Sequence, residues 1–127
     1  MMLTEENDMN ALIAILLPVL IQIESSNNPD AVGDGGDGVG LLQIHKCVVD
    51  DVNKFYKTNY DYSDRKDPIK SKSMFRLYAR YWAVHYEKST GQKATLEVIA
   101  RIWNGGPDGW KKKATDTYWE KVKELLK

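Results

Sequence analysis

The sequence lacks several features that would define a class of protein on their own. It contains one cysteine, Cys47, among 127 residues, so an internal disulfide is excluded, and a lone thiol does not make a metal site. His45 and His85 have no ligand partners at metal-binding spacing, so we expect no metal and no cofactor. Because Cys47 lies in a segment that looks helical and apolar, we expect it to be a small buried hydrophobe.

An excess of charge of one sign is also absent. Eighteen basic and eighteen acidic residues give a net charge of zero, which gives no reason to expect nucleic acid or an anionic membrane as a partner. The start of the chain is acidic, whereas a secretory signal begins with basic residues. The apolar run 11–23 is too short to span a bilayer, and Pro18 interrupts it. We therefore expect neither a signal peptide nor a membrane span in this sequence.

Alternating strand patterns, repeats and low-complexity tracts are missing too, whereas helical periodicity is common. With 43% hydrophobic residues, the chain suits one domain, residues 1–127, with a real core. Thr4, Thr95 and Thr115 are expected helix caps, and Asp67 precedes a proline at a first helical position. The fold class is therefore mainly α. The expected helices span residues 4–17, 19–25, 41–56, 67–89, 95–104 and 115–126.

A glycine-rich loop at residues 30–40 holds five glycines and three aspartates. Its segment 33–38 matches the dinucleotide-binding fingerprint by letter, but it follows a helix, and Asp34 and Asp37 would repel a pyrophosphate. A calcium loop fits poorly because the acids do not alternate and no glutamate closes the loop. A close backbone approach to a ligand, or a small β-hairpin, is the simpler use of so many glycines.

Glu24 is the single acid at the end of the apolar run 11–23. Burial disfavours the charged form of a carboxyl group, and the negative end of a helix dipole acts in the same direction. Both effects would raise the pKa of Glu24 and keep its proton available near neutral pH, as a general acid in glycoside cleavage requires. The alternative is a solvated glutamate at a helix end.

Four sequence blocks stand in an order that is similar to one known family. They are Glu24-Ser25 within the block 23–29, the block 40–44 with Gln43, the block 100–107 with Trp103-Asn104, and Tyr118 ahead of Val122. From about Pro18 to Val122 the chain resembles the soluble lytic transglycosylases, helical lysozyme-like domains that cut peptidoglycan. The resemblance implies a lysozyme-like helical domain.

The resemblance also implies roles for individual residues. Glu24 would be the single catalytic acid/base, Ser25 would help to hold the glycan, and Tyr118 would lie near the acid. Gln43 and Asn104 would line the glycan cleft, although both amides are alternatively structural groups that close backbone hydrogen bonds. Two positions depart from the family pattern. Leu42 stands where methionine is usual, and Trp103 replaces the usual tyrosine, which keeps a ring and loses a hydroxyl.

Three functions follow as alternatives. A lytic transglycosylase needs one carboxyl group, Glu24, because the sugar supplies its own nucleophile and forms a 1,6-anhydro end. A lysozyme-type hydrolase of the same bond usually needs a second carboxylate, for which Asp34 or Asp37 is available, unless both serve only the turn. The third alternative is a glycan-binding or structural component without turnover.

The resemblance places the substrate in the cell wall, either in the periplasm or outside the cell. The partner is then a peptidoglycan glycan strand. Because no signal peptide is evident, we expect a phage particle or a secretion apparatus to deliver the protein, or a leader to have been trimmed from it.

Overall fold

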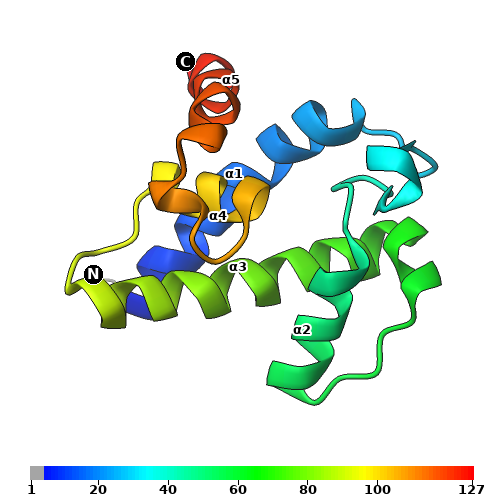
Figure 1. The fold of residues 1–127 in the computed structure, drawn as a ribbon, viewed down its shortest axis with the longest axis horizontal. Coiled ribbons are helices and arrows are strands. Elements are labelled where there is room, and N and C mark those ends of the chain that lie inside the picture. The colour runs from blue at the N-terminus through cyan, green and yellow to red at the C-terminus, as the bar shows by residue number, and fades with distance from the viewer. Residues whose placement is uncertain (1–4) are drawn as a thin grey trace. The chain divides into compact units, whose positions relative to one another are not determined.

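The structure, a computed structural model, describes residues 5–127, and for residues 5–7 it describes the backbone only. The described residues form five α-helices and one two-stranded antiparallel sheet, so the mainly α fold class with a small hairpin is confirmed (Figure 1). The expected cap Thr4 lies outside the described residues.

Contacts within the chain divide it into two compact units. The terminal unit combines Met1–Leu20 with Ala79–Lys127, and the central unit is Ile21–Tyr78. Two helices, α1 (Glu5–Ser25) and α3 (Pro68–Thr90), have residues in both units. That the whole chain works as one domain stays a prediction.

Helix α1 spans Glu5–Ser25 and continues through Pro18. Leu16 and Leu20 are completely buried. Over residues 8–25 the helix is long and apolar enough to cross a membrane by length and composition, which differs from the expectation that the run is too short. However, 33% of that window is buried, and a core helix or a signal sequence meets the same criterion.

The central unit carries the small sheet that the glycine-rich loop predicts. Strand β1, Val32–Gly33, pairs with β2, Gly38–Val39, and Gly33 lies opposite Gly38. The 3-10 turn η1, Asp34–Gly36, joins the two strands. The remaining elements of this unit are helix α2, Lys46–Tyr56, the 3-10 helix η2, Tyr62–Lys66, and the first half of α3, Pro68–Thr90.

Helix α2 begins five residues later than the sequence indicates, because Leu41 starts the predicted helix and Lys46 starts the observed one. Gly40 and Gln43 have φ values of 87° and 51°, which are left-handed and incompatible with a right-handed helix. Val39 and Ile44 form an antiparallel bridge across this turn. Cys47 is exposed in the first turn of α2, so the prediction that it is buried is wrong.

The terminal unit contains the last half of α3, helix α4, Leu96–Gly105, and helix α5, Asp116–Leu126. Two 3-10 turns, Gly109–Lys111 and Lys113–Thr115, join α4 to α5. The caps predicted at Asp67 and Thr95 are confirmed, because they accept hydrogen bonds from the backbone N–H groups of Lys70 and Val98.

Thr115 precedes α5 but does not cap it with its side chain. Its buried hydroxyl instead lies 2.8 Å from the carbonyl oxygens of both Gly109 and Lys112. The predicted side-chain cap is therefore wrong, because the hydroxyl turns back into the preceding loop.

Candidate active site

Glu24 lies in the last turn of α1, one residue before the helix ends at Ser25. Glu24 is half-buried and takes part in at least one interaction with other residues. Glu24 is therefore neither fully exposed nor free of partners, which is compatible with a role as an acid. Ser26 and Asn27 follow with φ values of 52° and 64°, so the chain leaves the helix immediately after the Glu-Ser pair.

The neighbouring hydroxyl of Ser25 is committed to the backbone. It donates to the carbonyl oxygen of Leu41 at 2.8 Å and lies 3.2 Å from the carbonyl oxygen of Ile21. It also accepts a hydrogen bond from the backbone N–H of Asn28. The Ser25–Leu41 bond joins the block that contains Glu24 to the block at residues 40–44, so the structure brings these two predicted blocks together.

The side chain of Gln43 folds back over the hairpin. Its Nε2 donates to the carbonyl oxygens of Ala31 at 3.0 Å and Gly40 at 3.1 Å, which uses both amide protons. A Cβ atom at Gly33 would lie 2.5 Å from Gln43 Oε1, and one at Gly38 would lie 2.9 Å from it. The paired glycines therefore provide the space for the amide group. Of the two roles considered for Gln43, these contacts favour the structural one.

Arg65 is a member of the site that sequence reasoning missed. Its side chain is 7% exposed. Nη1 donates to the carbonyl oxygens of Asp37 at 3.0 Å and Ile44 at 3.1 Å, and Nε donates to that of Tyr62 at 2.8 Å. Nothing in the sequence separates this arginine from the exposed Lys66 beside it, because both lie in a polar connector.

His45 holds both aspartates of the glycine-rich loop. Its Nε2 lies 2.8 Å from Asp34 Oδ2, and its Nδ1 lies 3.1 Å from Asp37 Oδ2. The ring of His45 therefore lies between the two aspartates and contacts both of them. Sequence reasoning considered His45 only as a metal ligand and missed this role.

The remaining predicted site residues belong to the terminal unit. Trp103 is half-buried and Asn104 is exposed at the end of α4, whereas Tyr118 is 9% exposed in α5. Glu24, Ser25, Asp34 and Gln43 belong to the central unit. That the two groups share one cleft stays a prediction.

Arg101 links α4 to α5 within the terminal unit. Its Nη1 pairs with Asp116 Oδ1 at 2.6 Å, and its Nε lies 2.9 Å from Glu97 Oε2. The hydrogen bond to Asp116 is the main reason that the pKa of Arg101 is raised. The link fixes the start of α5 and therefore supports the placement of Tyr118, two residues after Asp116.

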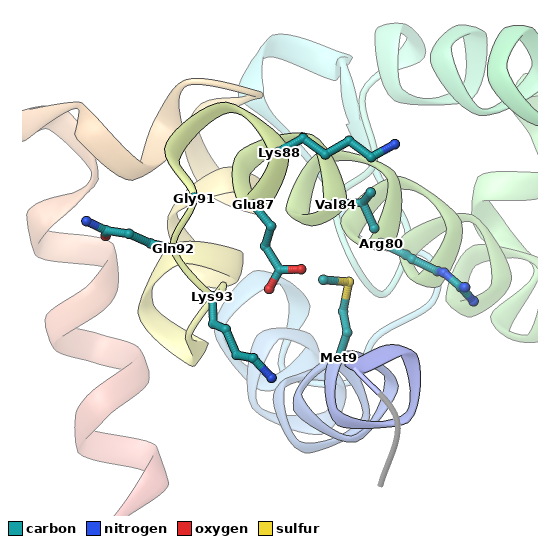
Figure 2. Close-up of a pocket in the computed structure, with 8 residues that line it drawn as sticks. All are labelled: Met9, Arg80, Val84, Glu87, Lys88, Gly91, Gln92 and Lys93. Atoms are coloured by element: carbon teal, nitrogen blue, oxygen red, sulfur yellow. The ribbon is translucent and has the colours of Figure 1, made fainter.

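A cavity of about 400 Å³ lies in the terminal unit and contains none of the predicted site residues. Figure 2 shows Met9 of α1 and Glu87 of α3 pointing into it. One Glu87 carboxylate oxygen accepts a hydrogen bond from the backbone N–H of Ala94 at 2.8 Å. This carboxylate therefore ties the end of α3 to the following loop, and we assign the cavity no part in the predicted site.

Comparison with protein families identifies the chain. A model of the Transglycosylase SLT domain matches residues 1–125. The chain belongs to this family. Comparison with curated proteins finds no match. The predicted resemblance and the lysozyme-like helical fold class are thereby confirmed, and membership of the transglycosylase SLT family implies a glycosidase of the lytic transglycosylase type that acts on cell-wall peptidoglycan.

Proposed function

We propose that this SLT-family protein is a lytic transglycosylase with Glu24 as its single general acid/base. It would cut the β-1,4 bond between N-acetylmuramic acid and N-acetylglucosamine and leave a 1,6-anhydro end. The observation that carries the proposal is the place of Glu24. It is half-buried at the end of α1 and directly precedes the serine that is hydrogen-bonded to Leu41.

In the first step the protonated carboxyl group of Glu24 donates its proton to the glycosidic oxygen, and the bond to the anomeric carbon breaks. In the second step the resulting carboxylate takes the proton of the muramic C6 hydroxyl. That oxygen then bonds to the anomeric carbon of its own ring. Glu24 gives up one proton in the first step and regains one in the second, so the reaction needs no second acid. Because the nucleophile is intramolecular, it also needs no bound water.

Roles in the terminal unit are proposed from the family resemblance. Tyr118 would position the carboxyl group of Glu24, Asn104 would bind polar groups of the glycan, and the ring of Trp103 would contact a sugar face. In the central unit Ser25 would hold the glycan only through the turn that it fixes, because its hydroxyl is committed to Leu41.

The hydrolase alternative assigns a water-activating role to Asp34 or Asp37. His45 opposes it, because its ring nitrogens lie 2.8 Å and 3.1 Å from these two carboxylates. The carboxylate oxygens that contact the imidazole ring are already in use and are less accessible to a water molecule. We therefore propose that Asp34 and Asp37 fix the hairpin, and that Asp34→Asn keeps turnover within about threefold. A collapse of turnover in Asp34→Asn would favour the hydrolase.

The proposed domain is the whole chain, residues 1–127, and the proposed partner is a glycan strand of the wall. The proposed means of delivery is a phage particle or a secretion apparatus. The rival without turnover is a glycan-binding or structural component. It would bind purified sacculi without releasing soluble fragments.

The test is Glu24→Gln with Glu124→Gln as the matched control, since Glu124 is exposed near the end of α5. We expect Glu24→Gln to bind sacculi like the parent protein and to lose turnover by about 100-fold or more, while the control is unchanged. Mass analysis of the products decides the chemistry, because an anhydro end is lighter than a hydrolysed end by one water. Unchanged turnover in Glu24→Gln would remove Glu24 as the acid.

A further inference from the structure

The turn at residues 40–44 is hydrogen-bonded to the end of α1 and to the hairpin of the central unit. The carbonyl oxygen of Leu41 accepts from Ser25, and that of Gly40 accepts from the Gln43 amide. The carbonyl oxygen of Ile44 accepts from the backbone N–H of Val39. Every one of these bonds ends on the turn, so a shift of the turn would reach Ser25 and the adjacent Glu24.

Arg65 holds this turn from the side of η2. One nitrogen of its guanidinium, Nη1, donates to Ile44 in the turn and to Asp37 in the hairpin, and Nε donates to Tyr62. A Cβ atom at Gly40 would collide with the backbone carbonyl oxygen of Arg65. The turn therefore contacts both the side chain and the backbone of Arg65.

The charge of Arg65 is not used in an ion pair. Its three hydrogen bonds all go to backbone carbonyl groups, and no salt bridge to a carboxylate of residues 8–127 accompanies them. Burying a cation without a counter-charge is unfavourable, and an apolar residue of similar shape often stabilises a fold more. What the guanidinium offers is geometry, because its planar fork fixes several acceptors at once and an ammonium group does not.

We propose that Arg65 is a positioning residue for the glycosidase reaction. It fixes the turn at residues 40–44, on which Ser25 docks, and thereby fixes the carboxyl group of Glu24. The proposal rests on the proposed role of Glu24 as the acid. A displacement of about 1 Å at a reacting group can lower a rate by about 100-fold. Loss of Arg65 should therefore lower kcat.

The experiment compares Arg65→Met and Arg65→Lys with Arg76→Met, which removes an exposed guanidinium from α3 in the same unit. Each variant is first checked for folding by circular dichroism and thermal melting. Hydrogen exchange of the amides of Val39 and Ile44 then reports the turn. Release of soluble fragments from purified sacculi gives kcat and KM separately.

For Arg65→Met we expect the amides of Val39 and Ile44 to exchange at least about tenfold faster, and kcat to fall by about 10- to 100-fold. We expect KM to stay within about threefold. Arg65→Lys should recover part of kcat, and Arg76→Met should match the parent protein. If Arg65→Met does not fold, Arg65→Lys takes its place, with a smaller loss of the same kind.

Two kinetic results would overturn the proposal. One is an unchanged kcat in a folded variant whose turn exchanges faster. The other is a rise of KM at constant kcat, which would place the effect on glycan binding. Failure of the proposed function appears separately, as absence of turnover in the parent protein and in Arg76→Met. In that case the exchange of Val39 and Ile44 decides alone whether Arg65 fixes the turn, and exchange at the parent rate in Arg65→Met would overturn the proposal.

Discussion

The hydroxyl of Ser25 and the carbonyl oxygen of Leu41 are 2.8 Å apart, although sixteen positions separate the two residues. This bond fastens the end of α1 to the turn that precedes α2. A serine next to a catalytic glutamate is readily interpreted as a substrate ligand, but here its proton is already used. The short polar side chain serves to hold the proposed acid against the rest of the central unit.

Ser25→Ala should therefore act on both stability and turnover. Removing the hydroxyl leaves the Leu41 carbonyl without this donor, so we expect the free energy of unfolding to fall by about 1–2 kcal/mol. We also expect kcat to fall more than KM changes, because the end of α1 loses a fixed contact. Urea denaturation and sacculus digestion measure the two effects. Ser63→Ala, at an exposed position of η2, is the control, and equal stability of both variants would contradict the assignment.

Gly33→Ala should be destabilising through Gln43. Gly33 has φ −140° and ψ −173°, which alanine adopts without strain. Its Cβ would lie 2.5 Å from Gln43 Oε1, and the amide cannot swing away without breaking its bonds to Ala31 and Gly40. We expect a loss of about 1–3 kcal/mol in the free energy of unfolding.

A double-mutant cycle tests the cause. In a Gln43→Ala background the added methyl group meets open space, so Gly33→Ala should lose most of its effect, and the two changes should be non-additive by at least about 0.5 kcal/mol. Gly35→Ala is the matched control, because Gly35 has φ 66° and no neighbour within 4 Å of a Cβ atom. Its strain should add to Gln43→Ala independently. Additive behaviour of Gly33→Ala would show that the amide does not fill the space beside Gly33.

Much of the fold could be predicted because helix signals are local. The cap at Thr95, the Asp67-Pro68 start and the helix end at Ser25, just before Asn27-Asn28-Pro29, all depend on residues within about one turn of a helix end. The late start of α2 could not be found in this way. The apolar spacing at Leu41, Leu42 and Ile44 fits a helix, but bonds from distant Ser25 and Arg65 hold these residues in a turn.

The candidate site was predictable in part, for the same reason. Residue type and position in the chain were enough to single out Glu24, whose half-buried place at a helix end agrees with its predicted setting. The partners of the side chains were not predictable, because hydrogen-bond acceptors on the backbone carry no sequence signal. For this reason the sequence leaves both a glycan role and a structural role open for Gln43, favours a glycan role for Ser25, and gives no indication of Arg65.

Asp51 should make stability depend on pH. Burial is the largest cause that raises the pKa of this carboxyl group, and nearby Lys54 opposes the shift. A raised pKa means that the folded state holds the proton after the unfolded state has released it, so stability falls as pH rises through that window.

Asp51→Asn should remove this loss, so that the variant is more stable than the parent at neutral pH and the two converge in acid. Thermal melting from pH 3 to 7 measures this, with exposed Asp30→Asn as control. A less stable Asp51→Asn at pH 7 would contradict it.

Thr115 should matter for the terminal unit although it caps no helix with its side chain. Its hydroxyl is fully buried, lies 2.8 Å from two carbonyl oxygens, and accepts a hydrogen bond from Arg101 Nη1 at 3.2 Å. Thr115→Val keeps the shape and removes every one of these bonds, so we expect a loss of about 1–3 kcal/mol in the free energy of unfolding. The exposed Thr117→Val, two residues away, should change it by no more than about 0.5 kcal/mol. Because the loop that Thr115 closes leads into the helix of Tyr118, Thr115→Val should also lower turnover at a temperature where it is folded. If both valine variants melt together, the buried hydroxyl does not hold the loop.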